Sequence, residues 1–206
     1  MLDWVLSLRA EGARRGAEAR LRAHPWPAPL QLALARLAAD SHEAWLVGGS
    51  VRDVLLGRQA SPRWDVATDR LPDQVRAVFA RVEGVGERHG TVLVLDDGLE
   101  LEVTTFRREG EYSDLRRPDQ VWFTRDVLED LARRDLTVNA MAYSVAAGRL
   151  LDPHDGARDL KRRTLRAVGD RSSASARTRC ARCAWPASRR CWRWSPTTRR
   201  APRSRA

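Results

Sequence analysis

Cysteine is missing from the first 170 residues, and the three cysteines of the chain all lie in its C-terminal segment. Their absence excludes a disulfide framework from the body of the protein and favours a cytoplasmic location. No apolar run approaches the roughly 20 residues that cross a bilayer, and no secretory signal precedes the first predicted helix. We therefore expect a cytoplasmic protein that has no membrane partner.

Lysine is scarce throughout, and acidic residues are missing near the C-terminus. Lys161 is the only lysine, and residues 171–206 combine eleven arginines with no aspartate or glutamate, which gives this segment a charge of +11. The preceding 170 residues contain 26 basic and 27 acidic side chains and are nearly neutral. The net charge of +10, which would indicate a nucleic-acid partner if it were spread over the domain, belongs to the C-terminal segment alone.

The segment 170–206 also lacks valine, isoleucine, leucine, methionine and phenylalanine. Because it cannot bury enough apolar surface to offset the entropy of ordering its backbone, we expect it to be disordered. Cys180 and Cys183 have the spacing of half a zinc site, but only the lone Cys191 follows, and the nearest histidine is His154. No zinc is therefore expected. An arginine-rich arm that binds RNA through charge remains an alternative.

The hydrophobic pattern of the other residues predicts an α/β (α+β) protein. Residues 1–42 are expected to form two N-terminal helices that break at His24–Pro27, and residues 43–169 to form one domain. In that domain we expect strands at 45–47, 64–68, 90–96 and 99–106 and helices at 50–57, 71–82 and 125–134. Residues 137–145 lead into another strand, and residues 149–168 into a strand, a turn, a short helix and a last strand.

A glycine pair, Gly48 and Gly49, follows the first of these strands and opens a helix. Paired glycines let a backbone approach a phosphate closely, and a helix N-terminus presents free N–H donors there. Arg52 adds a guanidinium that suits two phosphate oxygens at once. This pattern favours nucleotide binding by these three residues. Taken alone, a glycine pair before a helix is more often an ordinary connection between a strand and a helix.

Several blocks stand in a fixed order between residues 44 and 169: LVGGSVRDVLLGR, WDVATD, RHGTVLVL, LEVTTFR, EDLARRDLTVNAMAYS and LLDPHDGARDL. In order and spacing they resemble the head of a class II tRNA nucleotidyltransferase or a bacterial poly(A) polymerase. The resemblance implies a polymerase-β-like nucleotidyltransferase head, which is a small mixed sheet with helices packed behind it. It also implies transfer of a nucleotide from ATP or CTP to the 3′ end of tRNA or another RNA.

The resemblance further implies Mg²⁺ as the cofactor, held by carboxylates on neighbouring strands. Asp65 fills the second position of the family's Asp-x-Asp pattern, and Glu102 suits the third carboxylate, so both are predicted to be catalytic and to bind the metal. The alternation of Glu102 with Glu100 would equally suit an ordinary solvent-facing strand. Arg63 stands where the family has its first aspartate. This departure predicts weak metal binding.

The block RRDLTVNAMA supplies the remaining candidates. By resemblance, Arg133 and Arg134 are predicted to bind the nucleotide, with Arg134 on the triphosphate, whereas Asn139 is expected to be structural. The alternative for the two arginines is a pair of helix-end cations that complement the helix dipole. Three further residues are expected to shape turns and cap helices and not to bind a ligand: Asp152, Gly156 and Asp159.

After VGD, the family continues with a helix that reads the incoming base, but this chain has RSSASARTRCARCAW. The excess of arginine over lysine indicates a GC-rich gene. Residues 175–188, written in GC-rich codons and regrouped one base earlier, give R-E-D-A-L-R-A-V-R-L-A-R, which contains the motif of that helix. The segment from about residue 170 is therefore predicted to be an out-of-frame translation.

The function expected from these residues is that of an RNA nucleotidyltransferase head whose family adds CCA to tRNA 3′ ends. Weak or no activity is expected here, because Arg63 replaces a metal ligand and the base-reading helix is missing. Poly(A) synthesis is an alternative, since nothing in residues 1–170 separates the two reactions. An alternative of another class is a non-catalytic remnant that binds nucleotide or RNA.

Overall fold

The computed structural model describes the backbone of residues 2–58, 63–86, 89–109 and 121–169, and the side chains of these residues except 2–9, 109 and 121. Three predictions for residues 170–206 lie outside the described residues: disorder, an out-of-frame origin and the lack of a zinc site. Most of the polar segment between residues 107 and 123 also lies outside them.

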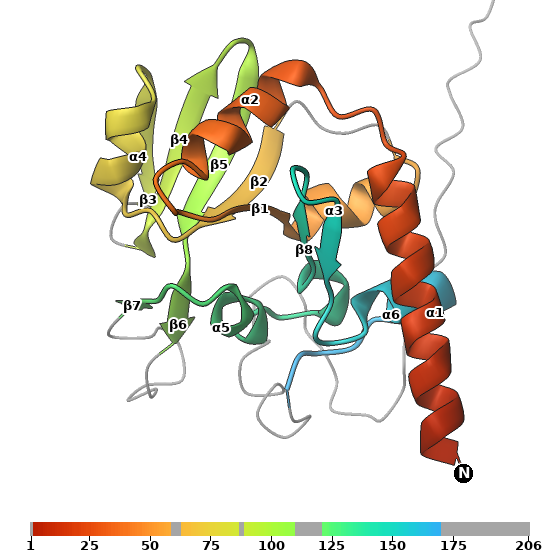
Figure 1. Ribbon diagram of the computed structural model, residues 1–206. Helices are drawn as coiled ribbons and strands as arrows, with labels where there is room; N and C mark the ends of the chain where they lie inside the picture. Colours follow the sequence, from red (N-terminus) through yellow and green to blue (C-terminus); the bar gives the residue numbers. More distant parts are fainter. Residues whose placement is uncertain (1, 59–62, 87–88, 110–120, 170–206) are drawn as a thin grey trace, which may run out of the picture.

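Within the described residues, a mixed sheet of seven strands forms the centre of the molecule, in the order β3-β4-β5-β2-β1-β8-β9 (Figure 1). The strands are β1 (Ala44–Val47), β2 (Arg63–Thr68), β3 (Val82–Gly86), β4 (Thr91–Asp96), β5 (Leu99–Thr105), β8 (Ala142–Ser144) and β9 (Arg149–Leu151). β2 and β5 run parallel, whereas the other neighbours are antiparallel. β6 (Arg107–Glu109) and β7 (Val121–Phe123) pair in a separate ribbon. The predicted mixed sheet is confirmed.

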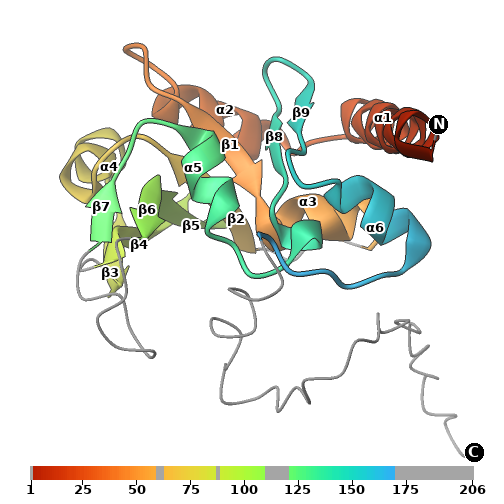
Figure 2. The same cartoon turned by 90° about the horizontal axis from the view of Figure 1, so that it is seen from below.

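The helices pack around this sheet. They are α1 (Leu2–Arg22), α2 (Ala28–Leu37), α3 (Gly48–Leu55), α4 (Pro72–Val78), α5 (Val127–Ala132) and α6 (Gly156–Arg162), with a 3-10 turn η2 (Thr137–Asn139). α1 packs beside α6, at the end of the molecule opposite α4 (Figure 2). The break between α1 and α2 falls where the prolines predict it. Trp26 fixes this break, because its Nε1 donates to the Leu21 carbonyl at 3.0 Å and its ring stacks on Tyr143.

The two faces of the sheet are buried by different partners. Leu46, Trp64 and Val66 point to the main core, which α2 and α3 complete. Trp45, Val47 and Ala67 point to the second face and pack against Val127 and Leu131 of α5. α2 and α5 accordingly lie on opposite sides of β1 in Figure 1. Because side chains alternate along a strand, the second face is also the face that carries the side chains of Asp65 and Glu102.

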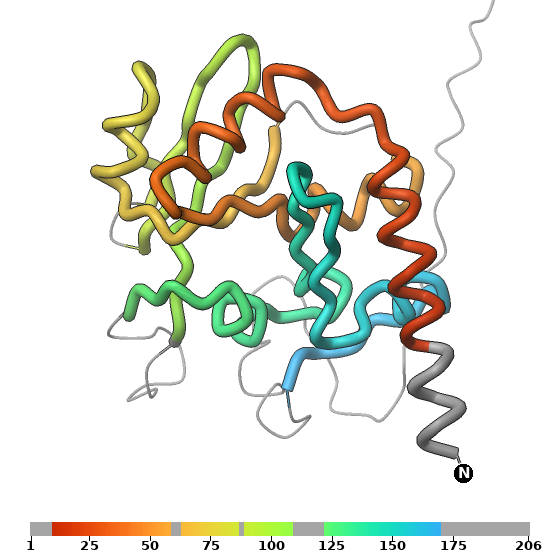
Figure 3. Tube along the Cα trace, viewed as in Figure 1, coloured from red at the N-terminus to blue at the C-terminus, as the bar shows by residue number. Residues whose placement is uncertain are grey.

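The chain trace explains how the second face acquires its neighbours (Figure 3). After β5 the chain leaves the sheet, forms α5 and η2, and returns so that β8 lies beside β1. Leu46 pairs with Tyr143 and Val47 with Ala142 in this return. The turn that precedes β8 is thereby fixed next to the start of α3.

Some sequence predictions differ from the structure at element ends. α3 begins at Gly48 and not at Ser50. α4, which was predicted to reach residue 82, ends at Val78, and β3 begins at Val82. β3 was missed because it is a largely exposed edge strand that holds two glycines, and only its pairing with β4 defines it. The last predicted strand is reduced to one isolated bridge between Leu136 and Ala167.

Candidate functional site

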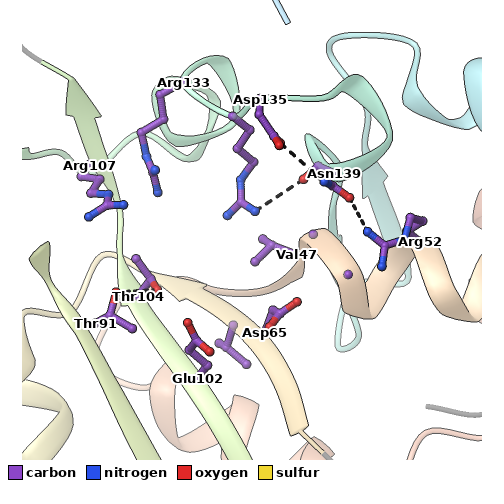
Figure 4. Close-up of a pocket in the computed structure, with 14 residues that line it drawn as sticks. Val47, Arg52, Asp65, Thr91, Glu102, Thr104, Arg107, Arg133, Asp135 and Asn139 are labelled. Carbon is purple, nitrogen blue, oxygen red and sulfur yellow. Dashed lines mark hydrogen bonds between the residues drawn. The ribbon is translucent and has the colours of Figure 1, made fainter. Parts of the chain in front are cut away.

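A cavity of about 550 Å³ opens on the second face of the sheet, between β2, β5, the start of α3 and the end of α5. It is lined by every residue that the sequence analysis predicted for catalysis, metal binding or nucleotide binding: Gly48, Gly49, Arg52, Asp65, Glu102, Arg133 and Arg134. In Figure 4, Arg133 points from α5 toward the strands that carry Asp65 and Glu102. The volume is typical of small-molecule sites.

The start of α3 forms one wall of the cavity, and it requires glycine. Gly48 has a φ of +59°, and a Cβ built there would lie 3.1 Å from Arg134 Nη1. A Cβ built at Gly49 would lie 3.0 Å from Asp65 Oδ2. No side chain among the described residues caps the first turn of α3. The free backbone N–H groups and the positive end of the helix dipole therefore favour an anion at this wall.

Arg133 and Arg134 are held on the opposite wall by a carboxylate that the sequence analysis missed. Asp130 is fully buried, and Arg133 donates to its Oδ1 from Nε at 2.9 Å and from Nη2 at 2.6 Å. Arg134 Nη2 donates to Asp130 Oδ2 at 2.9 Å. The signal was present in the spacing, since Asp130, in the last turn of α5, precedes the two arginines by three and four residues. The two guanidiniums are thus fixed by a buried partner.

Arg134 keeps donors for a ligand. Its Nε is buried and has no hydrogen-bond partner among the described residues. Its Nη1 lies 3.4 Å from the Asn139 carbonyl oxygen, which is a long hydrogen bond. A buried guanidinium with an unused donor, next to an uncapped helix start, is suited to bind an anionic group.

Arg52 is oriented by two neighbours. Its Nε and Nη2 donate to the Asp53 carboxylate at 2.9 and 3.2 Å. Its Nη1 donates to Asn139 Oδ1 at 2.6 Å, and this bond is drawn in Figure 4. Asn139 was expected to be structural, and the structure places it in the cavity wall as the group that positions Arg52. Asp135, Arg107, Thr91 and Thr104 also line the cavity, and the sequence analysis did not propose them as ligands.

The two carboxylates on the strands lie side by side, but one of them is engaged. Asp65 and Glu102 are register partners on the parallel strands β2 and β5. Arg63 Nη2 lies 2.6 Å from Glu102 Oε2. Among the described residues, no group of three or more His, Cys, Asp or Glu side chains is arranged to hold a metal. With one carboxylate neutralised by a guanidinium, these donors do not fit the pair of Mg²⁺ ions that the resemblance implies.

Ser50 and the region around α6 support the cavity without lining it. The Asp65 backbone N–H donates to Ser50 Oγ at 2.7 Å, which fastens β2 to α3. Asp152 accepts from the N–H groups of Gly156 and Ala157, as a helix cap does. Asp159 accepts from Thr137 Oγ1 at 2.7 Å and thereby holds η2, the turn that carries Asn139. The contacts of Asp152 and Asp159 agree with their predicted structural roles.

His154 makes the stability of this region depend on pH. Burial, and then the nearby Arg166, lower the pKa of His154 below its ordinary value of 6.5. The unfolded chain then binds more protons below pH 6.5, so stability is full above this value and is lost as the pH falls, at no more than about 1.4 kcal/mol per pH unit. Burial raises the pKa of Asp152, so the stability that this carboxyl contributes is full below its ordinary value of 3.8 and is lost as the pH rises above it, which is opposite in sign to the effect of His154.

Urea unfolding of the wild type and of His154→Gln at neutral and mildly acidic pH tests this prediction. We expect the wild type to lose more stability between the two pH values than the variant does. Equal losses would show that His154 does not carry the effect.

Every helix in the described part of the chain is too short or too polar to span a bilayer.

Comparison with known proteins places these features in a family. The poly A polymerase head domain matches residues 44–166. The CCA-adding enzyme of Bacillus pumilus is 49% identical over 134 residues, which cover 65% of this chain and 33% of that protein. The CCA-adding enzyme of Streptococcus pyogenes serotype M2 is 52% identical over 136 residues, which cover 66% of this chain and 33% of that protein.

Comparison with solved structures also finds a CCA-adding enzyme. The CCA-adding enzyme of Bacillus stearothermophilus in complex with CTP matches with a TM-score of 0.65 and 37% identity, over 73% of this chain and 35% of that chain. The chain spans about a third of the length of the curated relatives it matches.

Proposed function

Since this chain belongs to the poly A polymerase head domain family, we propose that it is the nucleotide-binding head of a tRNA nucleotidyltransferase. The reaction forms a bond between an RNA 3′-hydroxyl and the α-phosphorus of a nucleoside triphosphate, and pyrophosphate leaves. The observation that carries the proposal is the cavity in which an uncapped helix start faces two arginines that a buried carboxylate holds in place.

Each wall of the cavity has a proposed role. The backbone of Gly48 and Gly49 and the guanidinium of Arg134 bind the triphosphate, assisted by Arg52 and Arg133. Asp65 lines the cavity beside the two glycines, and its carboxylate is proposed to orient the attacking hydroxyl and to accept its proton. Glu102 is the second predicted catalytic carboxylate, and its ion pair with Arg63 makes it a weaker one.

CCA addition is the favoured reaction, because the relatives compared above are CCA-adding enzymes and one of the solved structures contains CTP. ATP and CTP are accordingly the proposed nucleotides, and the 3′ end of tRNA is the proposed acceptor. The match of this chain covers only a third of the length of those relatives. Selection of the incoming base and binding of the RNA are therefore assigned to the segments of the relatives that this chain does not match.

A non-catalytic nucleotide-binding role is the second candidate, and the ion pair between Arg63 and Glu102 favours it. Incubation with tRNA lacking its CCA end, Mg²⁺ and labelled CTP or ATP separates the two candidates. We expect slow incorporation that Asp65→Asn abolishes. Incorporation unaffected by Asp65→Asn would assign the chemistry to other residues, and triphosphate binding without incorporation would support the second candidate.

Nucleotide binding is expected to be weak and similar for ATP, CTP, GTP and UTP, because the proposed contacts are all to phosphates. Arg52→Ala should weaken each affinity by at least about fivefold, since a charged hydrogen bond is lost. Arg36→Ala is the matched control, because Arg36 pairs with Asp96 at 3.1 Å and does not line the cavity. Calorimetric titration measures all four affinities, and a clear preference for one base would contradict the proposed contacts.

A further inference from the structure

Arg63 introduces a fixed cation at the carboxylates of the cavity. It lies on β2 two residues before Asp65, so both side chains are on the second face of the sheet. Its guanidinium reaches across to β5 and meets Glu102, with Nη2 and Oε2 2.6 Å apart. Glu102 lines the cavity directly beside Asp65, its register partner. The positive charge of Arg63 therefore lies beside Glu102, a residue that lines the cavity, although Arg63 itself does not line it.

The balance of charge in the cavity changes as a result. Three carboxylates line it, Asp65, Glu102 and Asp135, and an added triphosphate would bring several more negative charges beside the first two. Carboxylates so placed ordinarily need a cation between them and the phosphates. The ion pair with Arg63 neutralises Glu102 without a metal. The negative charge that remains in the cavity is smaller, and the arginines on the opposite wall balance part of it. A guanidinium beside the carboxylates also repels a divalent ion.

We propose that this cavity binds a nucleoside triphosphate as the metal-free anion, with the Arg63–Glu102 ion pair taking the place of a metal-bound carboxylate. The inference rests on the proposed function, since it concerns the same cavity and the same class of ligand. It adds that binding of the triphosphate does not depend on a divalent cation, and that Arg63 is the residue responsible. Aspartate at this position would convert the cavity to metal-dependent binding.

The test is equilibrium binding of CTP and of ATP to the full chain, with Mg²⁺ in excess and with EDTA in excess. For the wild type, we expect affinities in the two conditions to differ by less than about threefold, because the neutralising charge is covalently attached. For Arg63→Asp, we expect the affinity in EDTA to fall by at least about tenfold and Mg²⁺ to restore it. Arg81→Asp is the matched control, since it makes the same charge change at an exposed ion pair, with Glu83.

A second readout does not involve nucleotide. Titration with Mn²⁺, followed by electron paramagnetic resonance, should detect no tight site in the wild type and a new site in Arg63→Asp. Thermal unfolding confirms that both variants are folded. Triphosphate binding by the wild type only in the presence of Mg²⁺ would overturn this inference and leave the proposed function intact. The absence of binding in both conditions would overturn the proposed nucleotide site and the inference with it.

Discussion

Replacement of Asp130 with asparagine should destabilise the protein by about 3–5 kcal/mol, the cost of removing one partner from a buried ion pair. Asp130 is fully buried and is the shared acceptor of Arg133 and Arg134, whose side chains are only 13% and 17% exposed. Without the carboxylate, two positive charges lose their partner in a confined place. The arginines would also lose their orientation toward the cavity, so we expect triphosphate affinity to fall by more than about tenfold.

Asp96→Asn is the matched control for this variant. Asp96 accepts from Arg36 at 3.1 Å in an ion pair that is 27% and 43% exposed on its two sides, and its loss should cost less than about 1 kcal/mol. Urea unfolding gives both values. If Asp130→Asn does not fold, Arg134→Gln tests the same cavity, because Asp130 then still accepts the hydrogen bonds from Arg133. Equal effects of Asp130→Asn and Asp96→Asn, or an unchanged affinity in Arg134→Gln, would contradict the role assigned to this cluster.

Gly48→Ala should lower triphosphate affinity by at least about tenfold, because the new methyl group meets the guanidinium that we propose binds phosphate and obstructs the close approach that glycine permits. The Cβ would lie 3.1 Å from Arg134 Nη1, and φ is +59°. Gly57→Ala separates backbone strain from obstruction. Gly57 has a φ of +67°, and no described atom lies within 4 Å of a Cβ built there.

Both alanine variants should lose about 1–2 kcal/mol of stability through backbone strain. Only Gly48→Ala should lose nucleotide affinity. Unfolding by urea and calorimetric titration with CTP measure the two effects on the same samples. An equal loss of affinity in both variants would mean that strain in α3 and its surroundings, and not crowding in the cavity, governs binding.

Much of the cavity could be predicted from local patterns. The glycine pair after an apolar strand marks the start of α3 because a positive φ and a close approach both need glycine. Alternation within each strand places Asp65 and Glu102 on the side opposite the apolar residues of β2 and β5, and the Asp97–Gly98 step predicts the hairpin between β4 and β5, where φ is +44° and +76°. These features depend on residues that are close in sequence.

The features that escaped prediction depend on the tertiary structure. Asp130 has the spacing of an ordinary helix-surface partner, and only the packing of α5 against the second face shows that it is buried. The ion pair between Arg63 and Glu102 joins strands whose parallel pairing no local pattern fixes. β3 exists because β4 provides hydrogen bonds to a segment whose own residues are mostly exposed.

The out-of-frame origin of the segment from about residue 170 is still a prediction. The family match ends at residue 166, just before this segment. Nucleotide sequencing of the gene around codon 170, with the same region of closely related strains, tests it. We expect the gene to differ from those of the related strains by a single-base insertion or deletion, whose reversal restores R-E-D-A-L-R in frame. The same reading frame continuing to codon 206 in those strains would contradict this prediction.

The most direct test of the nucleotide site is a crystal structure of this chain with CTP bound. We expect the triphosphate between the start of α3 and the end of α5, with hydrogen bonds from the backbone of Gly49 and from Arg134. Another hollow of about 500 Å³ lies beside Trp26 and Tyr143 and provides a built-in comparison. A triphosphate found in that hollow, or elsewhere away from Arg134, would contradict the account.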